Sequence, residues 1–370
     1  MKFGGMFVVL LAVLGTSSVK ALALKSRGEL KEAVNAWVRD PEEARATYGG
    51  AIGEWDVSEV DDMSEMFCGD DDWCSCGDLC EYFQAFDDDI SSWNVSTVTS
   101  MQRMFMGASS FNGDLSSFNT SSVTTMAGMF SGASSVNSNL SSFDTSSVTT
   151  MDSMFNRASS FNGDLFSFNT SSVTTMKNMF SSASAFNSDL SGFNTSSVRT
   201  MHGMFESASA FNGDLSGFDT SSVTSMAFMF FSARLFNGGL SKFDTSSVTR
   251  MDSMFHSASS FNGDLSNFDT SSVTTMWGMF YMASSFNGDL SSFDTSSVMT
   301  MENMFQGASS LNQDLSAWQI SDGATNINDS CMTCPEDPLL SSFISFSTIF
   351  LLIFIIGLLY TFETPDSCDL

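Results

Sequence analysis

The stretch Val148–Ser172 reads V-T-T-M-D-S-M-F-N-R-A-S-S-F-N-G-D-L-F-S-F-N-T-S-S, and the chain repeats it with small changes. Each copy carries the motif Met-x-x-Met-Phe, and successive copies are 25 residues apart. The first Met of the motif stands at 101, 126, 151, 176, 201, 226, 251, 276 and 301. Units of this length cannot each bury an apolar face alone, so the period predicts a solenoid in which every repeat packs on its neighbours.

The apolar spacing within a repeat predicts one short helix and one short strand. Val123, Met126 and Phe130 are three or four residues apart, which is the spacing of one helix face. Leu140 and Phe143 belong to the extended segment that follows. We therefore expect an α/β solenoid of about ten coils over residues 51–320, with neighbouring coils about 4.8 Å apart.

Residues at the same place in every repeat predict columns that run along the stack. The Met and Phe columns fall at apolar positions, and Met fills irregular gaps well, so we expect them to form the core. Asparagines that stack in phase can hydrogen-bond one coil to the next, which predicts a structural ladder. These asparagines are Asn112, Asn137, Asn162, Asn187, Asn212, Asn237, Asn262, Asn287 and Asn312.

Residues 24–50 predict a helical cap over the first coil. Ser26-x-x-Glu29 has the form of a capping box that opens a helix. Pro41 stands in the first turn of a second helix, which ends at Gly49. A solenoid needs such a cap because its terminal coil would otherwise expose the core.

Seven cysteines indicate an oxidising compartment. An early copy of the motif, Met63–Phe67, precedes Met101 by 38 residues, which is one repeat plus thirteen, and the extra residues bring a cysteine-rich insert at 68–80. Zinc binding by the insert is a weaker alternative to disulfides, because the cysteine spacing matches no common ligand pattern. The disulfide candidates, with their pairing left open, are Cys68, Cys74, Cys76, Cys80, Cys331 and Cys334.

The two ends of the chain predict secretion and a membrane anchor. Residues 1–23 have the charge, the apolar run and the cleavage signal of a signal peptide. Residues 339–362 form an uncharged apolar run long enough for one transmembrane helix, with a juxtamembrane linker at 321–338 and a cytosolic tail at 363–370. We therefore expect a single-pass type I protein of the cell membrane with extracellular repeats. A lipid anchor attached near Asn328 is the alternative.

The formal net charge of −28 argues against nucleic-acid binding, because no basic patch offsets the repulsion from phosphates. Fourteen carboxylates lie between Glu54 and Asp89, with no Lys or Arg among them. This run predicts a solvated end of the molecule. A site for a divalent cation or a cationic partner is the sharper alternative.

The sequence shows no catalytic arrangement, so we expect a protein that is not an enzyme and uses no cofactor. His202 and His256 stand at different places in their repeats, and the spacing puts no nucleophile beside a base. A column of aspartates suits calcium only weakly, because the nonapeptide of calcium solenoids is missing. We favour turn hydrogen bonds or solvated acids for this column and predict no metal site. The column consists of Asp114, Asp164, Asp189, Asp214, Asp264, Asp289 and Asp314.

Six Asn-x-Ser/Thr sequons predict glycosylation of a secreted chain. They are Asn94, Asn119, Asn139, Asn169, Asn194 and Asn328. All lie in the first half of the repeats or beside the predicted membrane span, and residues 195–318 carry none. This sequon-free part coincides with the one irregular surface of the repeats.

An aromatic cluster in the sequon-free part is the candidate partner-binding site, and the cysteine-rich insert is the alternative, because loops on one face of a solenoid often carry binding. Most repeats place small or polar residues at the outward positions of the motif, whereas two repeats place large apolar residues there. Phe231, His256 and Tyr281 share one phase and should stack across three coils. A clustered, exposed aromatic patch usually marks an interaction surface, and packing against neighbouring coils is the alternative. The six candidate residues are Phe228, Phe231, His256, Trp277, Tyr281 and Met282.

The unit V-T-x-M-x-x-M-F-x-x-A-S-S-F-N-G-D-L-S-x-F-D-T-S-S is found at Val148–Ser172 with Phe166 and Asn169 as its departures. It resembles the repeat of the BspA-like leucine-rich-repeat surface proteins. The resemblance covers about Ile52–Trp318 and rests on nine copies in phase. It implies a leucine-rich-repeat-like stack and a role in attachment or recognition at the cell surface. The chain departs in having Phe where many relatives have Trp, and in its cysteine insert, so the ligand stays open.

The sequence thus predicts a non-enzymatic recognition or adhesion protein at the cell surface, whose partner is an extracellular protein or glycan. A structural component of a cell wall or coat is the alternative, because the Ser-rich faces are uniform. Ice binding by the Thr-Ser-Ser columns is disfavoured, because these residues precede a predicted helix and form no flat strand face.

Overall fold

The structure is a computed structural model that describes residues 23–316 and 318. The predicted signal peptide (Ala23 apart), juxtamembrane linker, transmembrane helix and cytosolic tail lie outside these residues, as do Cys331, Cys334 and Asn328. Within the described part, no helix is both long enough and apolar enough to cross a membrane.

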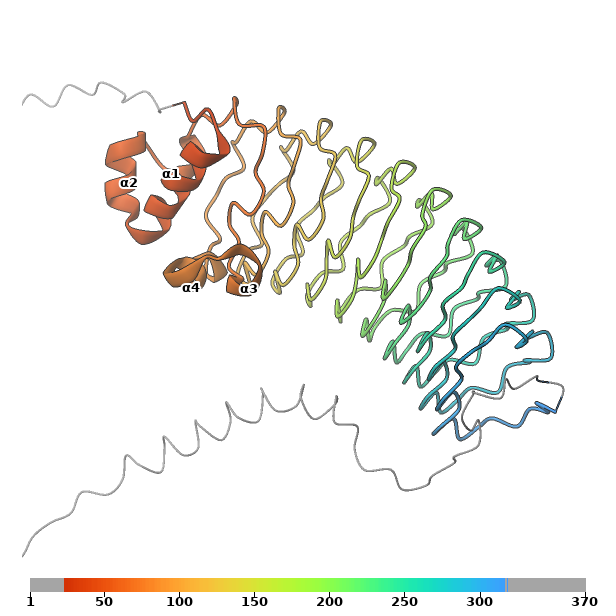
Figure 1. The fold of residues 1–370 in the computed structure, drawn as a ribbon. Coiled ribbons are helices and arrows are strands. Elements are labelled where there is room, and N and C mark those ends of the chain that lie inside the picture. The colour runs from red at the N-terminus through yellow and green to blue at the C-terminus, as the bar shows by residue number, and fades with distance from the viewer. Residues whose placement is uncertain (1–22, 317, 319–370) are drawn as a thin grey trace, which may run out of the picture. The chain divides into compact units, whose positions relative to one another are not determined.

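Two helices precede the repeats, α1 at Arg27–Arg39 and α2 at Pro41–Tyr48 (Figure 1). The Ser26 side chain accepts a hydrogen bond from the first turn of α1, and the Asp40 carboxylate accepts two from the first turn of α2. Gly49 ends α2 with a φ of 79°, which glycine adopts without strain. Local capping therefore sets where both helices begin and end.

Helix α1 lies against the first coil. Its residues Leu30 and Trp37 are buried and belong to the common core. The Lys31 ammonium donates to the carbonyl oxygens of Glu65 and Met66, at 2.8 Å each. Burial lowers the pKa of Lys31 to about 8. These contacts close the first end of the row of coils, and a 3₁₀ turn, Ile52–Glu54, then leads into it.

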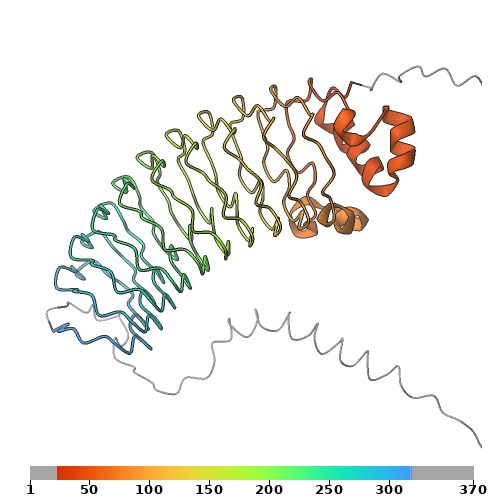
Figure 2. The same cartoon turned by 180° about the vertical axis from the view of Figure 1, so that it is seen from behind.

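The repeats form coils that lie side by side in a row, which Figures 1 and 2 show from opposite sides. Single parallel bridges join adjacent coils at the residue just before each motif, from Ser100–Thr125 to Thr275–Thr300. Each step is 25 residues, so equivalent residues of successive repeats lie next to one another. Columns of like residues therefore run along the row.

The motif itself is a series of turns, and we number its positions from the first Met. Backbone N–H groups at positions 1, 3, 5 and 7 donate to the next coil, as from Phe155 to the Met179 oxygen at 2.9 Å. Those at positions 4, 6 and 8 donate within their own coil, as from Met154 to the Met151 oxygen at 3.1 Å. This alternation pairs the backbone groups of the buried motif.

The short helix predicted for each repeat is wrong, because the described motifs contain two left-handed residues. Positions 3 and 7 have positive φ in all nine motifs, for example 55° at Ser153 and 57° at Arg157. A right-handed α-helix needs negative φ at every residue. The inward residues at positions 1, 4, 5 and 8 share the spacing of a helix face, and this spacing misled the prediction.

The strand predicted around Leu140 and Phe143 is also wrong. In the described repeats this segment is a turn, in which the Phe143 N–H donates to the Leu140 oxygen at 3.0 Å. Parallel pairing between the described coils is confined to the single bridges before each motif. Around this segment side chains supply the hydrogen bonds between coils, as from the Thr145 hydroxyl to the Asn169 oxygen at 3.1 Å, so the alternating pattern of a strand has no backbone ladder to support it.

The asparagine ladder is confirmed. The Asn137 N–H donates to the Asn112 Oδ1 atom at 2.8 Å, and the same bond recurs from coil to coil as far as Asn312. Asp87 takes the place of Asn in the first coil and accepts from the Asn112 N–H at 2.8 Å. Each side chain thus satisfies a backbone group that a turn leaves without a partner.

The core columns of Met and Phe are confirmed as well. Positions 1, 4, 5 and 8 are Met, Met, Phe and Ala in all nine motifs, and they are fully buried in the eight motifs that start at 101 to 276. The rings stack along the row, as Phe155 does on Phe180 with centroids 5.7 Å apart. A second ring, Phe161, stacks on Phe155 at 3.9 Å. The core therefore contains a continuous column of aromatic rings, to which most coils add a second ring.

The insert after Phe67 folds into three short helices at one edge of the row (Figure 1). They are α3 at Asp71–Cys74, a 3₁₀ helix at Gly77–Leu79, and α4 at Cys80–Gln84. The buried Phe83 joins α4 to the common core. The insert is therefore packed onto the coils.

Two disulfides hold the insert. One joins Cys68 to Cys74, with Cα atoms 6.1 Å apart, and the other joins Cys76 to Cys80, with Cα atoms 5.1 Å apart. Cys68 is fully buried beside the core. The first disulfide therefore ties α3 directly to the rigid part of the repeat row.

Candidate functional site

Within positions 1 to 8 of the motif, the side chains that differ between repeats are gathered on one surface. Positions 1, 4, 5 and 8 are constant and inward, whereas positions 2, 3, 6 and 7 vary. One motif carries Gln102-Arg103 and Met106-Gly107 at these places, and another carries Trp277-Gly278 and Tyr281-Met282. We call the surface made by positions 2, 3, 6 and 7 the variable face. Both histidines of the described chain lie on it.

Some bulky side chains of the variable face stand where the backbone favours glycine. Positions 3 and 7 have a left-handed backbone conformation in all nine motifs, and six of these eighteen residues are Gly. Yet Phe228 and Met282 adopt φ of 60° and 53° there, and Arg103 and Arg157 adopt 54° and 57°. A left-handed residue with a Cβ costs about 1–2 kcal/mol. These side chains are kept at a cost in stability, which is a common mark of functional positions.

Three of the predicted site residues form one stack. The His256 ring lies between Phe231, with centroids 4.3 Å apart, and Tyr281, at 4.5 Å, and both pairs are nearly parallel. The His256 side chain is buried, while its two neighbours are half-buried. Phe228 extends the group, since its ring contacts Phe231 at 5.8 Å and His202 at 5.4 Å.

The other two predicted residues lie at the surface. Trp277 is 37% exposed and Met282 is 53% exposed. The cluster is therefore partly packed and partly exposed, because the stack packs on itself and its edge faces solvent. Beside it, the buried Asp252 carboxylate accepts from the Arg250 guanidinium at 2.8 Å. The cluster is thus an apolar surface with a fixed ion pair beside it.

A second part of the variable face is hollow. A cavity of about 500 Å³ opens between α3 and the first four full motifs. Trp73 projects from α3 into the solvent with 59% of its side chain exposed. The coils contribute Gln102, Arg103 and Asn156 among others. Positions 2, 3, 6 and 7 of successive coils line the cavity, so it belongs to the variable face.

Three cations surround this cavity. The Arg103 guanidinium lies over the Trp73 ring, 5.1 Å from its centroid, and pairs with Glu65 at 3.3 Å. Arg157 and Lys177 line the cavity without a salt bridge to any described residue. The lining of the cavity holds these three cations and two carboxylates, whereas the whole chain carries a net charge of −28.

The carboxylates of the cavity are engaged in holding the backbone. The Asp152 carboxylate accepts from the Thr175 hydroxyl at 2.6 Å and from the Lys177 N–H at 2.8 Å. Asp70 caps α3 by accepting from the Asp72 N–H at 3.1 Å. Both carboxylates therefore have structural hydrogen-bond partners.

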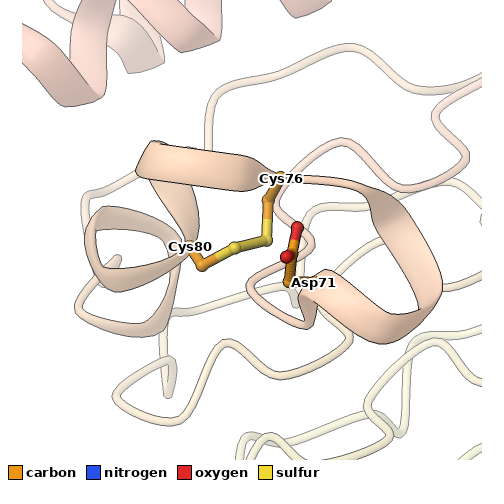
Figure 3. Close-up of side chains that lie close together, drawn as sticks. All are labelled: Asp71, Cys76 and Cys80. Atoms are coloured by element: carbon orange, nitrogen blue, oxygen red, sulfur yellow. A yellow bond between two sulfur atoms is a disulfide. The ribbon is translucent and has the colours of Figure 1, made fainter.

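The insert also brings Asp71, Cys76 and Cys80 close together, as Figure 3 shows. Their carboxylate oxygen and two sulfurs lie within 4.8 Å of one another, as the ligands of a metal ion would. The two sulfurs, however, are bonded to one another. Cysteine binds a metal ion as the thiolate, which these two disulfide-bonded residues do not offer. The Asp71 carboxylate accepts from the Gly77 N–H at 2.9 Å. The group is therefore a disulfide braced by a carboxylate.

The aspartate column has turn hydrogen bonds. The Asp114 Oδ1 atom accepts from the Ser116 N–H at 2.8 Å, and this bond recurs at the other six aspartates of the column. A second column, which includes Asp144, accepts in the same way from Ser146. The Ser146 hydroxyl and N–H lower the pKa of Asp144. These carboxylates therefore act as turn acceptors.

Five of the predicted glycosylation sites are described, and all five are exposed. In each, the Asn side-chain oxygen accepts from the N–H of the Ser two residues on, as Asn169 does from Ser171 at 3.1 Å. The side chains are Asn94, Asn119, Asn139, Asn169 and Asn194. Glycosylation of these residues stays a prediction.

Reasoning from the sequence named the cysteine-rich insert as a possible binding loop but missed the cavity beside α3. Trp73 belongs to an insert whose conformation no periodic pattern fixes, and the three cations come from different coils. A signal was present nevertheless. Arg103, Arg157 and Lys177 all occupy positions 2, 3 or 7, which vary between repeats while the rest of the motif is constant.

A known protein family matches the chain four times. Its description is Mycoplasma protein of unknown function, DUF285, and the matches lie at residues 42–141, 74–188, 164–244 and 236–336. Together they include every described repeat. Neither a curated protein nor a solved structure matches the chain.

Proposed function

Because the chain belongs to the family described as Mycoplasma protein of unknown function, DUF285, we propose that its repeats are a scaffold whose variable face binds a macromolecule. The role is recognition or adhesion without catalysis. The aromatic cluster of Phe228, Phe231, His256, Trp277, Tyr281 and Met282 is the principal contact surface. An extracellular protein or glycan is the partner.

One observation carries this proposal: sequence differences within the motif are confined to the variable face. Side chains that only maintain a stack have no reason to differ from coil to coil, and the inward residues do not. Phe228 and Met282 moreover occupy left-handed positions that Gly fills in other repeats. The Met282 side chain is exposed, and a bulky residue held there against backbone preference is best explained by what it contacts outside the chain.

The same proposal places the repeats outside the cell membrane. The two disulfides of the insert support an oxidising compartment. The apolar run at 339–362 supports a single membrane span, and the five exposed sequons support a secreted surface. Labelling of intact cells with a membrane-impermeant reagent tests this placement. Label found on the repeats supports it, and label found only after permeabilisation contradicts it.

The test of binding compares the full chain with a Phe231→Ser/Tyr281→Ser variant. Both proteins are immobilised and exposed to extracts of cell surfaces, with one extract treated by protease and one by glycosidases. We expect a component to be retained by the wild type and lost by the variant. The enzyme treatment that abolishes retention identifies the partner as protein or glycan.

A stability measurement makes this comparison decisive. Both side chains are half-buried, so the variant must keep most of its melting temperature for the loss of a partner to be meaningful. A Ser241→Ala/Ser291→Ala variant, altered in exposed residues of the same two repeats, serves as the control. Equal retention by all three proteins would contradict the aromatic surface. No retention by any of them would favour a structural coat protein.

A further inference from the structure

We infer that the cavity beside α3 is a second binding site, and that its ligand is an acidic polysaccharide. Trp73 packs on a sugar ring, and Arg157 and Lys177 pair with carboxylate or sulfate groups of the chain. This inference rests on the proposal that the variable face is a binding surface. It adds a site that is separate from the aromatic cluster.

The Trp73 ring is a rigid and exposed platform. The Cys68–Cys74 disulfide closes the loop that carries it, and Cys68 is itself fully buried. The Arg103 guanidinium lies over the ring, and Glu65 holds that guanidinium in place. The weakly positive C–H groups of a sugar ring pack well on the negative face of an aromatic ring. Because the ring is already fixed, little entropy is lost when it does so.

The charges around the cavity select an anion. Arg157 and Lys177 line the opening and have no salt bridge within the described residues. Asp152 already accepts two hydrogen bonds from the coils. A guanidinium and an ammonium that make no salt bridge within the described residues can bind carboxylate and sulfate groups through charge-assisted hydrogen bonds.

The remaining lining suits hydroxyl groups. The side-chain amides of Gln102 and Asn156 face the cavity and form no hydrogen bond within the described residues. Amides both donate and accept, so they match the paired donor and acceptor character of sugar hydroxyls. Met106 and Ala127 are the apolar contributions from the coils. This is a small apolar surface for binding the side chains of a peptide. The volume of about 500 Å³ fits within the usual range of ligand sites.

The net negative charge of the whole molecule disfavours nonspecific binding of acidic polymers. A chain with a net charge of −28 repels polyanions in general, so nonspecific capture of an acidic polymer is disfavoured. Binding of such a polymer must therefore come from a local site. The cavity is the place on the variable face where three cations meet.

The experiment measures binding of the full chain to polygalacturonate, dextran sulfate and neutral dextran at pH 7 and about 0.15 M salt. Arg157→Gln/Lys177→Gln is the test variant, and Trp73→Ala is a second one. Arg199→Gln/Lys242→Gln is the matched control, since it removes the same charges from exposed residues outside the cavity. Polygalacturonate and dextran sulfate separate carboxylate from sulfate recognition.

We expect the wild type to bind at least one acidic polymer and not the neutral one. The Arg157/Lys177 variant should lose about tenfold or more in affinity, as expected for charge-assisted contacts, and the control should be unchanged. Absence of binding to both acidic polymers would overturn the inference, as would equal loss in the control variant. Poly-glutamate is measured beside these polymers, and its binding with equal affinity would overturn the assignment to a sugar.

The outcome also separates this site from the proposed function. If the acidic polymers do not bind while the Phe231→Ser/Tyr281→Ser variant still loses a component of surface extracts, the variable face remains a binding surface and only this site is refuted. If neither ligand is found, the recognition role itself is refuted.

Discussion

At the scale of single residues, substitutions at the left-handed positions can test recognition without lowering stability. Met282 has a φ of 53° and an exposed side chain, and other motifs have Gly at its position. We predict that Met282→Gly leaves the protein as stable as the wild type or up to about 1 kcal/mol more stable, because relief of strain outweighs the entropy that glycine loses on folding. Urea denaturation checks this value.

The same variant should weaken binding of the partner to the aromatic cluster. A Met301→Gly variant is the contrast, because Met301 is fully buried at an inward position and its truncation should cost about 2–5 kcal/mol. If Met282→Gly destabilised the protein by more than about 1 kcal/mol, the side chain would be part of the packing and its proposed role would be contradicted.

At the scale of the repeat element, the asparagine ladder joins coils through side chains. Asn187 accepts from the Asn212 N–H at 2.8 Å and donates its own N–H to Asn162. We predict that Asn187→Ala lowers the free energy of unfolding by about 1 kcal/mol, because the Asn212 N–H loses its partner. Thermal or urea denaturation measures the change.

The matched control is Asn187→Asp, which keeps the accepting oxygen. Asp87 already fills this role for Asn112 in the first coil. The Asp variant should therefore retain most of the stability that the Ala variant loses. If both substitutions had the same effect, the hydrogen bond between coils would not be the cause.

Much of the coil, but not its backbone, could be predicted from the sequence. The period alone places Met154 and Phe155 in buried columns and Asn162 in a ladder, because equivalent residues of a stack must align. The backbone of the motif could not be read from apolar spacing, because turns and a helix put positions 1, 4, 5 and 8 on the same side. The glycines at positions 3 and 7, such as Gly128 and Gly132, carried the missing signal.

Part of the candidate site could likewise be predicted from the sequence. The stack of Phe231, His256 and Tyr281 follows from a shared phase, since each is at position 6 of its motif. The cavity beside α3 does not follow from phase. It depends on how the insert folds onto the coils, and its disulfides and short helices place Trp73 by contacts that have no period.

At the scale of the whole molecule, two columns of aspartates make stability depend on pH. Ser hydroxyl and N–H groups lower the pKa of eleven aspartates, from Asp89 to Asp314. The unfolded chain therefore binds more protons than the folded chain as the pH falls below about 4. The stability that these groups supply is present above that pH and is lost on acidification. Burial raises the pKa of Glu206, which acts in the opposite direction at a single residue.

We therefore predict that the melting temperature falls between pH 6 and pH 3, as measured by circular dichroism. An Asp244→Asn variant should be less stable than the wild type at pH 6 and should approach it at pH 3, because the introduced amide does not take up a proton in this range. Asn is compatible with the fold there, since Asn169 and Asn194 stand at the equivalent place. A melting temperature that is unchanged or higher at pH 3 would contradict the role of the columns.

The alternating hydrogen bonds of the motif have a consequence for how such a gene can change. The motif of every coil donates the same four backbone N–H groups to the next coil and accepts four from the coil before it. A further unit of 25 residues can therefore be inserted between two coils with these hydrogen bonds kept on both sides. Duplication or deletion of a whole unit should then leave the fold of the remaining coils nearly unchanged. The length of the row becomes freely adjustable, and each added copy brings four new outward positions on which selection can act.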